Sequence, residues 1–235
     1  MEFSPIKNNR VYEKVIEQIK NLIYENKIKK GDKLPSERKL KEQLNVSRAS
    51  IREAFSALEI IGLIESRPGE GTFIKKNPGE DFLEPLSLGL LLQENVTGEL
   101  LELRRVLEVD CVRLAAGRIK DEEINQMEEY IKELDQSSGF EEKSIKADKQ
   151  FHYAIARASG NKVLYYVMTS ISEAMDFHIK YTRTKLVSRK ETMDEFVKQH
   201  QKILDCLKNN DTDLAMKAME EHLNFVEKLI KKEIK

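Results

Sequence analysis

The sequence predicts a mostly α-helical protein with one small β-hairpin, divided into two domains. Apolar residues recur at intervals of three and four along most of the 235 residues, the spacing of amphipathic helices. Two strand-like runs, residues 63–67 and 72–75, flank a turn rich in Gly and Pro. The net charge also differs between the two parts of the chain. Residues 1–76 hold 16 Lys and Arg against 11 Asp and Glu, a net of +5, and residues 77–235 hold 24 against 30, a net of −6; together they give −1. A basic first part joined to an acidic body is typical of a nucleic-acid reader attached to a domain of another kind.

The first expected helix covers residues 10–26, and residues 29–32 then turn the chain. We expect this helix to pack beneath the next two as the third helix of the first domain. Its apolar side chains fall on one face: Val11, Val15, Ile19 and Leu22.

Residues 34–62 predict two short helices joined by a tight turn. Ser36 can cap the first helix, after Pro35 has kept the backbone extended. Asn45-Val46 makes the turn, and Ser47 can cap the second helix, which Gly62 is placed to end. The apolar positions that share faces are Leu40 and Leu44 in the first helix, then Ile51, Ala54, Leu58 and Ile61 in the second.

Arg48 and Arg52 lie four residues apart, opposite the apolar stripe of the second helix. A helix-turn-helix that binds DNA places such side chains against bases and phosphates, and Arg can grip guanine with two hydrogen bonds. The alternative is a solvated basic face on an ordinary helical hairpin. The β-hairpin that follows favours DNA binding, because it completes a winged helix-turn-helix with Gly69 at the wing tip.

Residues 8–76 resemble the N-terminal domain of the GntR family of bacterial transcription regulators. The resemblance implies that Arg38, Arg48 and Arg52 contact double-stranded DNA and that Gly69 reaches toward the minor groove. Ser47 and Ser50 complete the predicted DNA-contacting set. The matching residues are Leu34-Pro35-Ser36-Glu37-Arg38, Val46-Ser47-Arg48, Ile51-Arg52-Glu53-Ala54, Gly62-Leu63-Ile64 and Gly69-Glu70-Gly71-Thr72.

We therefore predict a winged helix-turn-helix domain at 1–76, with three helices and a hairpin wing, and a linker at 77–81. Residues 82–235 contain no Pro after Pro85 and few Gly, which predicts an antiparallel bundle of six to seven helices. The longest apolar run, residues 86–92, is too short to span a bilayer. With no signal peptide at the start and two cysteines among apolar neighbours, we expect reduced thiols and a cytoplasmic protein.

Three of the four histidines, with one aspartate, form a candidate metal site. Asp148 and His152 are four residues apart and therefore share one helix face, whereas His200 and His222 fall in the last two helices. One carboxylate and three imidazoles suit Zn²⁺ or Ni²⁺, with Mn²⁺ or Fe²⁺ as alternatives. Spacing alone leaves open whether the helices converge, and a lone helical His, such as His178, is more often an ordinary surface or core residue.

The region from Leu100 onward resembles the all-helical ligand-sensing domain, of FCD type, found in the FadR subfamily of GntR regulators. The resemblance implies that Asp148 and the three histidines hold a divalent cation, and that a fatty-acyl effector is disfavoured. The residues that carry it are Glu102-Leu103-Arg104-Arg105-Val106-Leu107-Glu108, Leu114-Ala115-Ala116, Asp148, His152, Gly160-Asn161, His200, Asp213-Leu214-Ala215 and His222-Leu223.

One Asp, three neutral His and a divalent ion sum to +1, which favours a small organic acid in the open coordination positions. Arg104 matches the family position that gives such an acid a second contact. The alternative role for Arg104 is an ion pair with Glu108 one helical turn later.

Two functions of different class follow from these patterns. The first is a DNA-binding regulator, expected to be a repressor, that forms a homodimer on a near-palindromic operator and senses a carboxylate. The second is a metal-dependent hydrolase or lyase with a basic accessory domain. The second needs a general base near the metal, and Glu221 points to a different helix face from His222.

Overall fold

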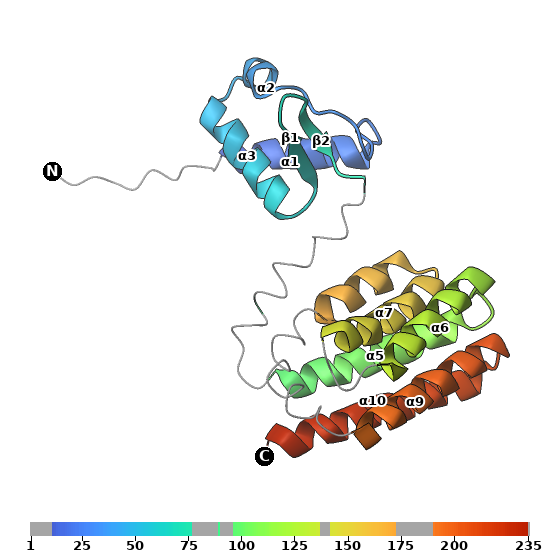
Figure 1. The fold of residues 1–235 in the computed structure, drawn as a ribbon. Coiled ribbons are helices and arrows are strands. Elements are labelled where there is room, and N and C mark those ends of the chain that lie inside the picture. Colours follow the sequence, from blue (N-terminus) through green and yellow to red (C-terminus); the bar gives the residue numbers. More distant parts are fainter. Residues whose placement is uncertain (1–10, 77–88, 90–95, 137–141, 173–189, 235) are drawn as a thin grey trace. The chain divides into compact units, whose positions relative to one another are not determined.

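The computed structural model describes residues 11–76, 89, 96–136, 142–172 and 190–234 (Figure 1). The chain divides into two compact units, Met1–Pro85 and Leu86–Lys235. The linker predicted at 77–81 lies outside the described residues, as does His178.

The first unit begins with three helices, α1 (Val11–Tyr24), α2 (Glu37–Leu44) and α3 (Arg48–Ile60). The predicted caps are present. The Ser36 hydroxyl accepts a hydrogen bond from the Lys39 N–H at 3.3 Å, and the Ser47 hydroxyl accepts one from the Ser50 N–H at 3.0 Å. Asn45 has φ 51°, the left-handed conformation that ends α2 and allows the tight turn into α3.

A two-stranded antiparallel sheet follows, formed by β1 (Ile64–Arg67) and β2 (Gly71–Ile74). Ile64 pairs with Ile74 at its base and Arg67 with Gly71 at its tip, so the hairpin projects as the predicted wing. The wing is anchored in the core of the unit, a single cluster of buried side chains from every element: Val15, Ile19, Leu34, Leu40, Ile51, Ala54, Phe55, Leu58, Ile64 and Ile74.

The second unit is a helical bundle, as the sequence predicts. Among the described residues its helices are α5 (Thr97–Ala115), α6 (Asp121–Asp135), α7 (Glu142–Ala158), residues 162–172, α9 (Lys190–Lys208) and α10 (Thr212–Ile234). Predicted breaks near residues 120, 160 and 210 are confirmed.

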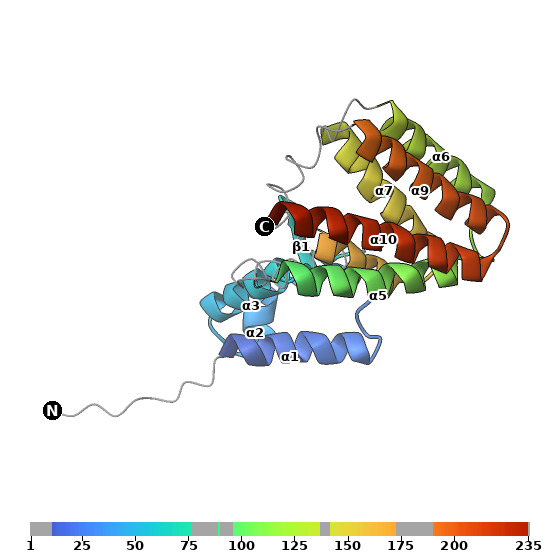
Figure 2. The same cartoon turned by 90° about the horizontal axis from the view of Figure 1, so that it is seen from below.

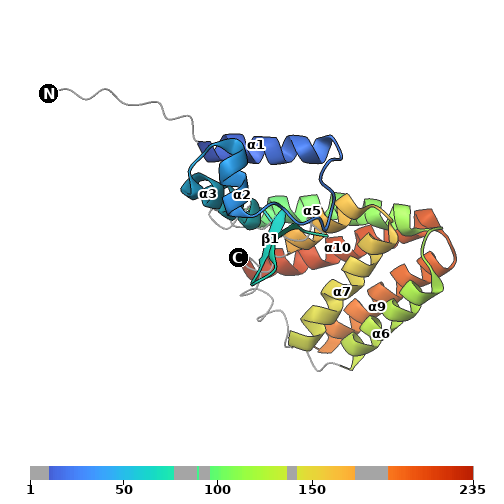
Figure 3. The ribbon, with the colours of Figure 1, turned by 90° about the horizontal axis from the view of Figure 1, so that it is seen from above.

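Sequence-distant helices pack together in this bundle. Helix α5 lies beside α10 (Figure 2), and α6 packs on both α7 and α9 (Figure 3). Helices α9 and α10 also contact one another after a three-residue turn at 209–211. This arrangement brings α5, α7, α9 and α10 around one interior, in which Phe151 and Leu204 are fully buried.

Both cysteines are free thiols, Cys111 buried and Cys206 partly buried, which agrees with the expected reduced state. Among the described residues, no helix combines the length and the apolar composition that crossing a bilayer requires.

Candidate metal centre and nucleic-acid interface

Three helices bring the four predicted metal ligands together. Helix α7 contributes Asp148 and His152 from adjacent turns, α9 contributes His200, and α10 contributes His222. All four side chains are buried, and one ligand atom from each lies within 4.8 Å of every other. The convergence that spacing left open is therefore present.

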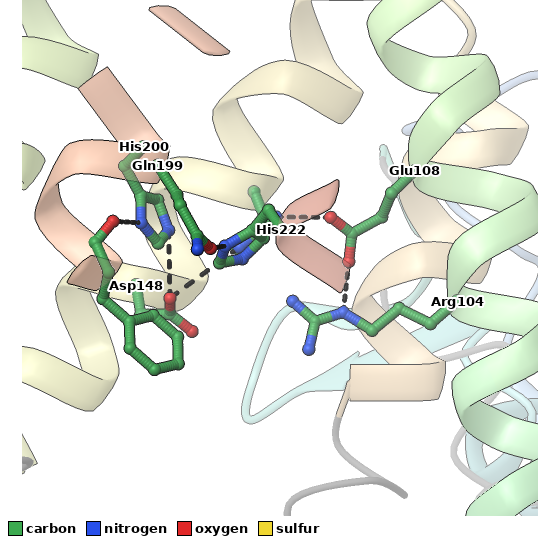
Figure 4. A network of polar contacts seen from close by, with 8 residues as sticks. Arg104, Glu108, Asp148, Gln199, His200 and His222 are labelled. Carbon is green, nitrogen blue, oxygen red and sulfur yellow. Dashed lines mark hydrogen bonds and ion pairs between the residues drawn. The ribbon is translucent and has the colours of Figure 1, made fainter. Parts of the chain in front are cut away.

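Each imidazole has a contact at its Nδ1 atom with a residue outside this cluster, and Figure 4 shows Gln199 beside His222. Nδ1 of His200 lies 2.7 Å from the main-chain oxygen of Phe196, and Nδ1 of His222 lies 3.0 Å from the side-chain oxygen of Gln199. Nδ1 of His152 forms an ion pair with Oε2 of Glu108. A main-chain oxygen can only accept, so Nδ1 of His200 donates this hydrogen bond.

The three Nε2 atoms face the cluster and suit a cation. All are buried, and none has a hydrogen-bond partner within the described part of the chain. Oδ1 of Asp148 lies 3.1 Å from Nε2 of His200 and 3.7 Å from Nε2 of His152. Buried polar atoms without hydrogen bonds are costly, and a cation among these atoms would satisfy them. Three imidazoles and a carboxylate, each oriented by an outer partner, form a donor set that fits a divalent transition metal.

The electrostatics of the cluster favour the metal-binding forms of His222 and Asp148. Burial lowers the pKa of His222 well below its usual range, and the neighbouring His200 and His152 lower it further, so this ring stays neutral. Burial would raise the pKa of Asp148, but its contacts with His152 and His200 lower it well below the ordinary value. A neutral imidazole and an ionised carboxylate are the forms that bind metals.

Arg104 forms the ion pair with Glu108 that the sequence offered as its alternative role. Both residues are buried in α5, with 6% and 2% of their surface exposed. The pair uses only Nε of Arg104; its two terminal nitrogens point toward His222 and Asp148 in Figure 4. The ion pair and the predicted effector contact are therefore compatible, because they use different nitrogens of the same guanidinium.

Glu108 is the site residue that the sequence analysis missed. It contacts both Arg104 and His152, although burial opposes its ionisation. These two partners outweigh burial and lower the pKa of Glu108 to about 2. For His152, burial opposes the charge, but Glu108 reverses the balance and raises the pKa of the ring. The position of Glu108 four residues after Arg104 could be seen in the sequence. Its contact with His152 of α7 could not.

The predicted DNA-contacting residues lie at the surface of the first unit. Arg38, Arg48 and Arg52 are exposed, on the helices that the turn at Asn45 connects. Nε of Arg48 donates to Glu37 at 2.8 Å, which ties α2 to α3. Gly69 is exposed at the hairpin tip with φ +76°, a conformation that favours glycine.

Ser47 and Ser50 act as a pair at the start of α3, with their hydroxyl oxygens 2.9 Å apart. Ser47 is exposed and Ser50 is partly exposed. The wing adds a basic feature that the sequence analysis did not single out: the Arg67 guanidinium lies over the Phe73 ring, 4.5 Å from its centre.

Comparison with known protein families identifies both units. Residues 11–74 match the model described as "Bacterial regulatory proteins, gntR family", and residues 99–225 match the FCD domain. This chain belongs to the GntR family. As a GntR-family transcription regulator it is not an enzyme, so the alternative of a metal-dependent hydrolase or lyase is wrong. Glu221, whose suitability as a base was doubtful, is at the surface and pairs with Lys202 at 2.6 Å.

Characterised and predicted relatives support this membership. The regulator is 33% identical to the HTH-type transcriptional regulator LutR of Bacillus subtilis, over 89% of this chain and 96% of LutR. It is 32% identical to the putative L-lactate dehydrogenase operon regulatory protein of Escherichia coli, over 95% and 87% of the two chains. Among solved structures, Streptococcus agalactiae GntR aligns with a TM-score of 0.68 and 26% identity, over 92% of this regulator and 98% of that chain.

Proposed function

We propose that this GntR-family regulator is a repressor whose helical unit binds a divalent metal and a small carboxylate effector, which together modulate operator binding. The observation that carries the proposal is the convergence of four buried ligand atoms within 4.8 Å, beside a buried arginine. The metal ligands are Asp148, His152, His200 and His222, and Arg104 is the effector contact.

The donor set favours Zn²⁺ or Ni²⁺, with Mn²⁺ and Fe²⁺ also compatible. Imidazole nitrogen suits the later transition metals. With only one carboxylate among the four ligands, the ligand set is of intermediate hardness and does not specifically favour hard cations. When bound, the ion supplies positive charge and open coordination positions for an anion. It also links α7 to α9 and α10, so it should stabilise the folded bundle by mass action.

The effector is best described as a small hydroxy-, keto- or sugar acid. The Arg104 terminal nitrogens point toward the cluster, so a carboxylate between them and the metal would gain a charge-assisted contact. A relative is named for an L-lactate dehydrogenase operon, which makes L-lactate the first acid to test.

DNA binding is assigned to residues 1–76, within the first unit, and effector binding and dimerisation to residues 82–235. One recognition helix reads few base pairs, so a two-fold homodimer on a near-palindromic operator is the expected active form. The proposed contacts in each protomer are Arg38, Ser47, Arg48, Ser50, Arg52 and Gly69.

Metal analysis followed by calorimetry tests the proposal most directly. Purified regulator should contain about one divalent ion per chain, bind a member of a panel of small acids, and change its operator affinity when the acid is added. Chelation should lower the melting temperature of the wild type, and His200→Ala should lose that response. His178→Ala serves as the control, because His178 is outside the predicted ligand set. Protein that holds no metal and does not respond to added Zn²⁺ or Ni²⁺ would contradict the proposal.

A further inference from the structure

The loop that precedes α2 pairs with the outer edge of the wing. Lys33 lies opposite Phe73 of β2 in an antiparallel bridge, and the Leu34 N–H donates to the main-chain oxygen of Thr72 at 2.8 Å. Side chains that lie directly opposite one another in antiparallel strands point to the same face. Lys33 and Phe73 therefore share a face, and the backbone of the wing fixes where Lys33 begins.

That shared face of the wing points away from the core. The next residue on each strand, Leu34 and Ile74, points the other way and is buried, as alternation along a strand requires. Lys33 is exposed and Phe73 is partly exposed. The Arg67 guanidinium lies over the same ring, 4.5 Å from its centre. The outer face of the wing thus carries two cations around one aromatic ring.

The Lys33 side chain runs along this face toward the tip of the wing. Its Nζ lies 5.8 Å from the centre of the Phe73 ring. A Cβ atom at residue 71 would lie 2.9 Å from Cε of Lys33 and 3.6 Å from Nζ, so the side chain passes over the bare backbone of Gly71. Gly71 pairs with Arg67 in the last pair before the turn that holds Gly69. The ammonium group is therefore delivered to the tip, although Lys33 precedes α2 in the sequence.

The two cations differ in how far their charge is already compensated. Nε of Arg67 donates to Glu65 at 3.0 Å, and Glu70 lies 3.9 Å from Nη1 of the same guanidinium. Lys33 forms no ion pair with any residue that the structure describes; its contact is with the ring. On this face, Lys33 is therefore the cation whose charge is available to an external anion.

We propose that Lys33 is a DNA-backbone contact of the wing, with its ammonium on a phosphate beside the groove that Gly69 approaches. An ammonium binds phosphate as a compact point charge. The Phe73 ring restrains the side chain before DNA arrives, so less conformational freedom is lost on binding. This inference rests on the DNA-binding role proposed for residues 1–76, and it adds a contact from outside α2, α3 and the hairpin.

Fluorescence anisotropy with a mixed-sequence DNA duplex, repeated across salt concentrations, tests this inference in the full chain. Lys33→Met removes the charge but keeps an apolar stem over Phe73. It should reduce the slope of log affinity against log salt concentration by about one for each protomer bound, whereas Lys33→Arg should keep the wild-type slope. Lys27→Met is the matched control, because Lys27 is exposed near the same loop but already pairs with Glu25 at 2.7 Å.

Urea denaturation of the same variants separates a DNA contact from a structural role. Lys33→Met should keep the wild-type stability, because the apolar stem still covers the ring. A wild-type slope in Lys33→Met, or an equal reduction in Lys27→Met, overturns this inference and leaves the proposed function standing. A reduced slope accompanied by a large loss of stability also overturns it, since the side chain then acts through the fold. Wild-type protein that does not bind the duplex at low salt overturns both this inference and the DNA-binding role.

Discussion

Arg104→Ala should destabilise the regulator because it leaves Glu108 as a buried carboxylate without its guanidinium. The pKa of Glu108 is about 2 instead of 4.5, so the balance of its two partners against burial favours the ionised form by roughly 3 kcal/mol. Breaking a buried ion pair by removing one member typically costs about 3–5 kcal/mol. His152 remains beside Glu108 and offsets part of that cost, so we expect a loss of about 3 kcal/mol in the free energy of unfolding.

Urea denaturation of metal-free protein measures this loss. Arg113→Ala is the control on the same helix, because Arg113 is half-exposed, pairs with Asp110, and should change stability by less than about 1 kcal/mol. A double variant, Arg104→Met with Glu108→Met, should recover much of the stability, since neither charge is then left alone. A loss below about 1 kcal/mol for Arg104→Ala would refute the reasoning, because it would mean that water already screens the pair.

Three further predictions concern the first unit and the thiols. If Arg52 contacts a base, Arg52→Ala should weaken operator binding by about 1–3 kcal/mol. If Arg52 contacts a phosphate, the substitution should reduce the slope of log affinity against log salt concentration by about one. Anisotropy titrations in which neither the affinity nor this slope changes would show that Arg52 does not contact the DNA. Leu58→Ala should cost about 2–5 kcal/mol in urea denaturation because Leu58 is fully buried, whereas Ile60→Ala, at a position 69% exposed, should cost far less. Cys206 should react with Ellman's reagent well before Cys111, because Cys111 is 1% exposed and burial raises the pKa of its thiol to about 12. Equal labelling rates would show that the bundle opens readily.

The elements of the first unit could be predicted from sequence because their signals are local. Ser36 and Ser47 each cap the helix that follows them. Asn45, between the two helices, adopts the left-handed backbone conformation that ends α2. The helix boundaries shift by one or two residues, as α1 begins at Val11 and ends at Tyr24 within the predicted range 10–26. Such shifts are expected where end turns depend on packing as well as on sequence.

The metal cluster was only partly predictable. The spacing of Asp148 and His152 places both on one face of α7, which any helix of that sequence would share. The approach of His200 and His222 depends on how α9 and α10 pack, and no local pattern encodes it; the family resemblance supplied that expectation. Glu108 was missed for the same reason, because its contact with His152 joins two helices.

The buried charges imply that the proposed effector depends on the metal. Arg104 and Glu108 cancel, so Asp148 leaves the site at −1 with neutral rings, or at 0 if one ring takes up a proton. A carboxylate added to either state would bury an uncompensated negative charge, which is costly in a protein interior. With a divalent ion and neutral rings the sum becomes +1, and a monoanion brings it to zero. Calorimetry before and after chelation should therefore show effector binding only in metal-loaded protein; equal affinity in both would mean that Arg104 holds the acid alone.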